Sequence, residues 1–200
     1  PGSVSHEGIQ FNATSRGRGS SIQYLVIDEA EWGITIYDSN PLLEDVTINN
    51  ADYVAVDLFN SANPTIRRLT VQDGGQDVHG GNPGTWRYGI GLSIGAGSAP
   101  LIQGATFDNL ILRAVNMWGN SGGMVSGVDI TNITGATLEW PAAIWVEDSI
   151  ALFQDINIGR SDNGIIVRHI TENGTTRPTF RDVVIEDSQY RGIFVEQNNH

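Results

Sequence analysis

Two short apolar patterns alternate along the chain, and they constrain its fold more than any other feature. The first is apolar-x-apolar, usually after a small residue, and its copies are Ile9/Phe11, Ile34/Ile36, Val54/Val56, Ile90/Leu92, Val115/Met117, Ile144/Val146, Ile165/Val167 and Ile193/Val195. The second is apolar-x-x-apolar-x-apolar, and its copies are Ile22/Leu25/Ile27, Leu43/Val46/Ile48, Ile66/Leu69/Val71, Ile102/Ala105/Phe107, Val125/Val128/Ile130, Phe153/Ile156/Ile158 and Phe180/Val183/Ile185.

Both patterns predict short β-strands, because alternation with a period of two, rich in β-branched residues, places one face of a strand in a core. Gly, Pro, Asn and Asp fill the gaps between the copies, as turns require. One round of both patterns takes about 20 to 36 residues, a repeat length typical of solenoids. A coil of this size buries its apolar edge only by stacking on the next coil.

We therefore expect an all-β fold, a single-stranded parallel β-helix of about seven to eight coils, and crossovers between parallel strands favour a right-handed path. The cadence of residues 46–50, "VTINN", in which an Asn closes the second strand, resembles the pectin-lyase-like superfamily of right-handed parallel β-helices. The resemblance extends from Gly8 to Val195 and implies the fold. It does not imply an activity, since this fold carries lyases, hydrolases, adhesins and passive spacers.

Composition limits the partners and the location. Residues 1–3 have the character of a tag remnant, and residues 4–200 are expected to form a single β-helix domain, a segment of a longer protein. Lysine and cysteine are absent, and the net charge is −12. Nucleic acid is therefore not an expected partner, and no apolar run predicts membrane insertion. An acidic, lysine-free surface fits an extracellular or cell-surface location, where carbohydrate or another surface protein would be the partner.

Stacking predicts which side chains share the outer face of the first strands. One outward column is expected to read Asn12, Tyr37, Asp57, Ser93, Trp118, Glu147, Arg168 and Glu196. The column beside it is expected to read Gln10, Thr35, Ala55, Gly91, Asn116, Trp145, Ile166 and Phe194. Aromatic rings beside carboxylates and arginine suit sugar binding.

The predicted ligand-binding residues are Trp118, Trp145, Glu147, Arg168, Glu196, Trp86 and Trp140. The last two belong to long insertions, residues 72–88 and 131–142, that are expected to wall a groove over this face. Two structural alternatives stay open. Glu147, Arg168 and Glu196 would form a salt-bridge ladder between coils, and a loop or a partner would cover the apolar column.

Candidates for catalysis are Glu147, Glu196, Arg168 and His169, the last expected near Asp148 of the preceding coil. Two glutamates two coils apart approach the spacing of an inverting glycosidase, but an arginine between them keeps both ionised. No cofactor is expected. No metal site is expected either, and Asp73 and Asp77 are the candidate ligands if calcium binds.

Three functions remain open from the sequence, and whether the chain is an enzyme is not decided. The first is a non-catalytic module of a secreted or cell-surface protein that presents a carbohydrate-binding or adhesive face. The second is a polysaccharide hydrolase or lyase. The third is a structural rod or spacer, and self-association through open coil ends or through the apolar face is expected to accompany it.

Overall fold

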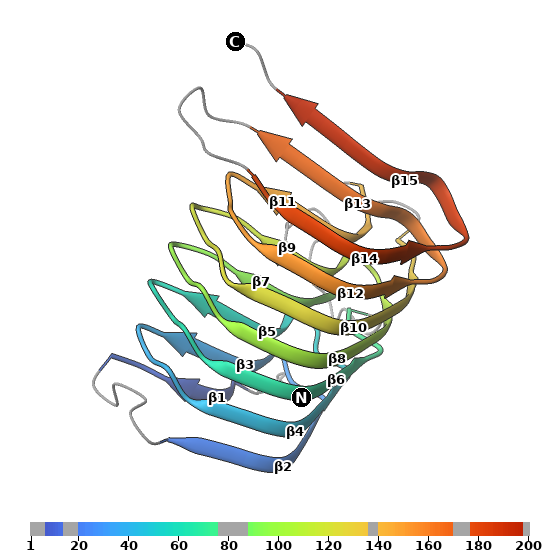
Figure 1. The fold of residues 1–200 in the computed structure, drawn as a ribbon. Helices are drawn as coiled ribbons and strands as arrows, with labels where there is room; N and C mark the ends of the chain where they lie inside the picture. Colours follow the sequence, from blue (N-terminus) through green and yellow to red (C-terminus); the bar gives the residue numbers. More distant parts are fainter. Residues whose placement is uncertain (1–6, 14–19, 76–87, 136–139, 170–176, 198–200) are drawn as a thin grey trace.

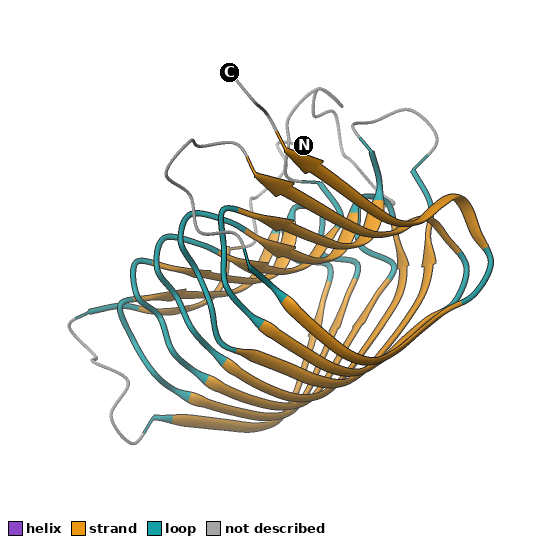
Figure 2. Ribbon diagram, turned by 45° about the horizontal axis from the view of Figure 1, so that its top comes forward, coloured by secondary structure: helices purple, strands orange, loops and turns teal. Residues whose placement is uncertain are grey.

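The computed structural model describes residues 7–13, 20–75, 88–135, 140–169 and 177–197. These residues form fifteen β-strands and no helix (Figure 2). Each strand from β1 to β13 pairs in parallel with the strand two places further along the chain. The chain is therefore a parallel β-solenoid, as its repeat predicted. Among the described residues no helix could span a membrane.

The strands stack in two columns (Figure 1). The first column contains β1 (Glu7–Phe11), β3 (Trp32–Tyr37), β5 (Val54–Phe59), β7 (Ile90–Ile94), β9 (Arg113–Met117), β11 (Ala142–Glu147), β13 (Ser161–His169) and β15 (Ser188–Gln197). The second contains β2 (Ser21–Asp28), β4 (Leu42–Asn49), β6 (Thr65–Gln72), β8 (Leu101–Leu110), β10 (Met124–Ile133), β12 (Leu152–Ile158) and β14 (Thr179–Ile185). One backbone pair, Ile133 of β10 with Ser161 of β13, joins the two columns directly.

The core lies between the two columns and is filled by the residues of both apolar patterns. Ile34, Ile36, Leu43 and Ile48 are almost completely buried there. Burial of one such side chain contributes about 1.5–3 kcal/mol relative to leaving it in water. The coils thus stabilise one another, because each apolar side chain contacts the equivalent side chain of the neighbouring coil.

A left-handed residue explains the three-residue step in the second pattern. In every strand of the second column the residue before the second apolar position has a φ between 51 and 75°, and these residues are Tyr24, Asp45, Arg68, Gly104, Gly127, Asp155 and Asp182. The left-handed residue turns the chain, so that apolar residues three apart both face the core. Because all coils turn at the same place, the backbone register between coils is kept.

The predicted register was wrong by two residues at β5 and β7. Asp57 pairs with Thr35, and Ser93 pairs with Asn116, so both lie in the column of Trp145 rather than in that of Glu147. The reason is that β5 and β7 each have three alternating apolar residues, and the first of them, Val54 or Ile90, packs in a separate cluster outside the main core. The pairing with the neighbouring strands uses the second and third of them, Leu58 being opposite Ile36.

Candidate functional site

The outward column that contains Trp145 is largely shielded from solvent. Asp57, Ser93 and Asn116 are buried, Trp145 is only 6% exposed and Ile166 is completely buried. The expectation that Trp145 presents an exposed ring is therefore wrong. Whether this column binds a ligand stays untested, but the ring offers no free face for stacking.

Two arginines from the neighbouring coils cover Trp145. The guanidinium carbon of Arg113, in β9, lies 3.9 Å from the centre of the indole, and that of Arg168, in β13, lies 5.2 Å from it. Both are cation–π contacts, worth about 0.5–1 kcal/mol each at exposed sites and more when desolvated. Arg113 also donates a hydrogen bond from Nη1 to Asn116 Oδ1, at 2.8 Å. The column is thus a structural seam between coils.

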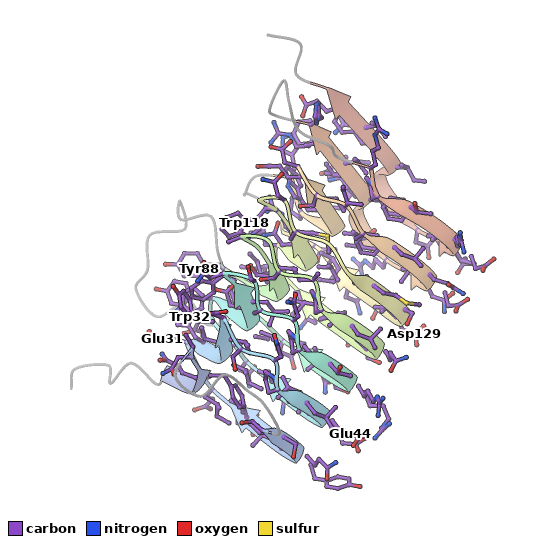
Figure 3. All side chains as sticks on the ribbon, turned by 60° about the vertical axis from the view of Figure 1, so that its left-hand side comes forward. Glu31, Trp32, Glu44, Tyr88, Trp118 and Asp129 are labelled. Atoms are coloured by element: carbon purple, nitrogen blue, oxygen red, sulfur yellow. The ribbon has the colours of Figure 1, made fainter. Side chains whose placement is uncertain are left out.

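Trp118 packs onto the preceding coil. A Cβ placed on Gly95 would lie 2.3 Å from Cε2 of Trp118, so the indole lies directly on the backbone of Gly95. Figure 3 places Trp118 on the side of the solenoid that also carries Trp32 and Tyr88. Trp118 thus contacts the β7 coil, whereas Trp145 contacts arginines of β9 and β13.

The three charged residues at the ends of the strands form a ladder. Glu147, Arg168 and Glu196 are in register on β11, β13 and β15. Arg168 Nε lies 2.7 Å from Glu196 Oε2, and Trp145 Nε1 donates to Glu147 Oε2 at 3.3 Å. The Arg168–Glu196 contact is one of the two ion pairs of the ladder that the sequence offered as a structural alternative. A partly exposed ion pair of this kind typically contributes less than about 1 kcal/mol.

His169 also has the neighbour that stacking predicted. Its Nδ1 lies 3.5 Å from Oδ1 of Asp148. The pair lies beside the ladder, at the ends of β11 and β13, and its side chains are mostly buried.

The candidate calcium loop is only partly visible. Asp73 accepts a hydrogen bond from Asn109 Nδ2 at 2.6 Å, which ties it to the next coil. Asp77 and Trp86 lie outside the described residues. Within the described ranges, no three His, Cys, Asp or Glu side chains are arranged to hold a metal ion.

A surface pocket of about 450 Å³ lies at the other end of these strands, where β13 and β15 begin. It is lined by Gly135, Trp140, Pro141, Asp162, Asn163, Tyr190 and Arg191. The volume suits a small ligand. Of the residues that the sequence singled out, the pocket contains Trp140 alone.

A β-bulge forms one side of the pocket. Ser161 pairs with Ser188 and Asn163 pairs with Arg191, so β15 has one residue more than β13 between these pairs. Gln189 and Tyr190 therefore lie opposite the single residue Asp162. Bulges of this kind re-aim side chains and are frequent beside active sites.

The aromatic side of the pocket is held in a strained conformation. Trp140 has a φ of 47° although Pro141 follows it, and a residue before proline normally avoids such a backbone. The Trp140 ring packs against Phe194 with 5.5 Å between ring centres. The guanidinium carbon of Arg191 lies 4.6 Å from the Trp140 ring centre and 4.4 Å from that of Phe194. Strain of about 1–3 kcal/mol is retained mainly where a conformation has a role.

The deep side of the pocket consists of hydrogen-bond acceptors. Asp162 and Asn163 are 5% and 4% exposed. Asp162 Oδ2 accepts from the backbone N–H of Gly135 at 3.2 Å, and Asn163 Nδ2 donates to the Pro141 carbonyl at 2.8 Å. Asn163 Oδ1 is buried and has no hydrogen-bond partner within the described structure. Such an acceptor costs about 1–3 kcal/mol, and a native protein rarely retains one without a reason.

Comparison with protein families adds the decisive observation on the fold. The model of the right-handed β-helix region matches residues 7–200. The chain belongs to the right-handed β-helix family. The resemblance to pectin-lyase-like proteins is thereby confirmed at the level of the fold. Comparisons with curated proteins and with solved structures return no match.

In this right-handed β-helix, the pocket is formed by residues that the repeating apolar patterns do not predict. The apolar patterns predict the centres of the strands. Four pocket residues lie before these patterns begin, and they are Asp162, Asn163, Tyr190 and Arg191. The only available signal was their spacing from the flanking serines. "SDNG" at 161–164 and "SQYRG" at 188–192 differ by one residue, which marks the bulge.

Proposed function

We propose that this β-helix is a non-catalytic carbohydrate-binding domain of a secreted or cell-surface protein, and that the carbohydrate binds in the pocket beside Trp140. The observation that carries the proposal is the combination of exposed aromatic rings with buried acceptors in one cavity. Trp140 is 43% exposed and Tyr190 is 67% exposed, while Asp162 and Asn163, which line the same pocket, are buried. A sugar ring stacks its C–H face on aromatic carbon and donates its hydroxyl protons to acceptors.

The positions of the acidic residues favour binding over hydrolysis. Glycosidases generally place two carboxylates about 5–9.5 Å apart across the scissile bond. Asp162 is the one carboxylate among the described lining residues. Glu196 pairs with Arg168, six residues along β13 from Asp162, which at about 3.3 Å per residue is on the order of 20 Å.

Binding is tested by titrating the domain with oligosaccharides in a calorimeter and repeating the titration with Trp140→Ala. We expect at least about a tenfold loss of affinity, because removing an aromatic stacking surface is worth on the order of 1–2 kcal/mol. Tyr24→Ala is the matched control. Tyr24 is also an exposed aromatic residue with a left-handed φ of 57°, but it lies on β2 in the second column.

Equal affinity of the wild type and Trp140→Ala would remove the pocket from the proposal. New reducing ends or unsaturated products after incubation with a bound polysaccharide would favour the hydrolase or lyase alternative. If Tyr24→Ala loses as much affinity as Trp140→Ala, the loss would instead indicate a general effect on the fold.

A further inference from the structure

We infer that the carbohydrate bound beside Trp140 is uncharged, and that it donates hydrogen bonds from neighbouring hydroxyl or amide N–H groups to Asp162 and Asn163. This inference rests on the proposed function and specifies the ligand class of the same pocket. It concerns the deep side of the cavity, where the ligand would be most desolvated.

The acceptors on this side have unused capacity. A carboxylate has two oxygens and about four lone-pair positions, and the backbone N–H of Gly135 occupies one of these on Asp162. The amide of Asn163 is oriented by its bond to the Pro141 carbonyl, so its oxygen rather than its nitrogen remains to be satisfied. Asp162 and Asn163 both line the pocket, so a ligand with two donor groups can reach an acceptor on each.

Neighbouring hydroxyl groups of a neutral sugar provide that arrangement. Hydrogen bonds from hydroxyl or amide groups to an ionised carboxylate are stronger than neutral ones, and more so away from water. A uronic acid would instead bring its own carboxylate toward Asp162, and two like charges in a poorly solvated pocket repel each other. The chain as a whole, with a net charge of −12, also repels polyanionic polymers at long range.

Arg191 is the lining cation, and its position agrees with this reading. Its guanidinium lies over the rings of Trp140 and Phe194, on the exposed side of the pocket. Its Cα pairs with that of Asn163, while its guanidinium is engaged by the two aromatic rings. In this arrangement it holds Trp140 in place for stacking.

The inference is tested by calorimetric titration with two sets of probes, each at low and at physiological salt. The neutral set is cellopentaose, xylopentaose and chitopentaose, and the acidic set is pentagalacturonate and an oligoguluronate. We expect at least one neutral probe to bind with an affinity nearly independent of salt. Asp162→Asn, which keeps the shape and an acceptor for Gly135, should weaken that binding by about tenfold or more.

The matched control is Asp155→Asn, which removes an exposed carboxylate from β12 in the second column. Tyr190→Ala, at an exposed position, provides a second variant of the pocket if Asp162→Asn fails to fold. Binding of the acidic probes alone, lost with Arg191→Gln, would overturn the inference and leave the proposed function intact. Absence of binding by every probe in both sets would overturn both.

Discussion

Replacing Gly127 by alanine should destabilise the solenoid through backbone conformation alone. Gly127 turns the chain in β10 with a φ of 63°. An added Cβ would lie 3.6 Å from the Gly104 nitrogen and 3.8 Å from its Cα, which are ordinary contacts. The left-handed conformation costs an alanine about 1–2 kcal/mol, and the lower entropy of alanine in the unfolded chain returns about 0.5–1 kcal/mol. The net loss is about 1 kcal/mol.

In the same column of left-handed residues, replacing a non-glycine residue by glycine should stabilise the fold. Tyr24 has a φ of 57° and is 80% exposed, so Tyr24→Gly relieves strain and loses little packing. We expect it to raise the free energy of unfolding by about 0.5–1 kcal/mol. Gly127→Asn should cost less than Gly127→Ala, because asparagine tolerates the left-handed region. Gly192→Ala is the control, since its φ is not left-handed and a Cβ there meets no atom within 4 Å.

The assay is urea unfolding followed by tryptophan fluorescence and by circular dichroism, with the slope compared between variants. A loss of about 1 kcal/mol lowers the melting temperature by about 2–4 °C for a domain of this size. Gly127→Ala and Gly192→Ala should then differ clearly, with Gly192→Ala neutral or slightly stabilising. If Gly127→Ala were as stable as the wild type, the turn would not be the source of the three-residue step.

Three further outcomes follow from other contacts. The hydrogen bond with Tyr88, followed by burial and nearby acidic groups, raises the pKa of Tyr53 to about 12. The contribution of Tyr53 to the stability of the fold is therefore complete below pH 10 and is lost as the pH rises from about 10 to 12. Tyr88→Phe should lower that pKa, as measured by tyrosinate absorbance. Gly95→Ala should displace the ring of Trp118, red-shift its fluorescence and cost about 1–3 kcal/mol; an unchanged spectrum would contradict the packing described. Arg168→Met should destabilise by about 1 kcal/mol or less, and urea unfolding that shows a loss of several kcal/mol would mean that the ladder is stronger than its exposure implies.

The fold was predictable because the spacing of apolar side chains along the sequence directly indicates where strands and turns lie. Residues such as Ile34 and Ile36 alternate inward and outward, and their burial follows that alternation. The three-residue step between Leu43 and Val46 was visible, but its cause was not. An aspartate at position 45 gives no sign by itself of a φ of 53°.

The register was less predictable than the fold. Val54, Val56 and Leu58 alternate without interruption, so the apolar pattern fits the neighbouring strand equally well in two positions. Apolar residues do not distinguish these positions, because both bury the same face. Only the complete stack places Asp57 beside Thr35, and a shift of two residues moves every outward side chain to a different column.

The location of the pocket follows from how parallel coils cover their own outer faces. On the middle of a strand, each outward side chain has neighbours about 4.8 Å away on both sides, and Arg113 and Arg168 use that proximity to cover Trp145. A large side chain in a regular column is therefore closed by its own neighbours. A cavity requires a place where the coils cease to match, and the extra residue of β15 opposite Asp162 provides it. In a solenoid, a break in register is thus a better guide to a binding site than an aromatic residue in an unbroken column.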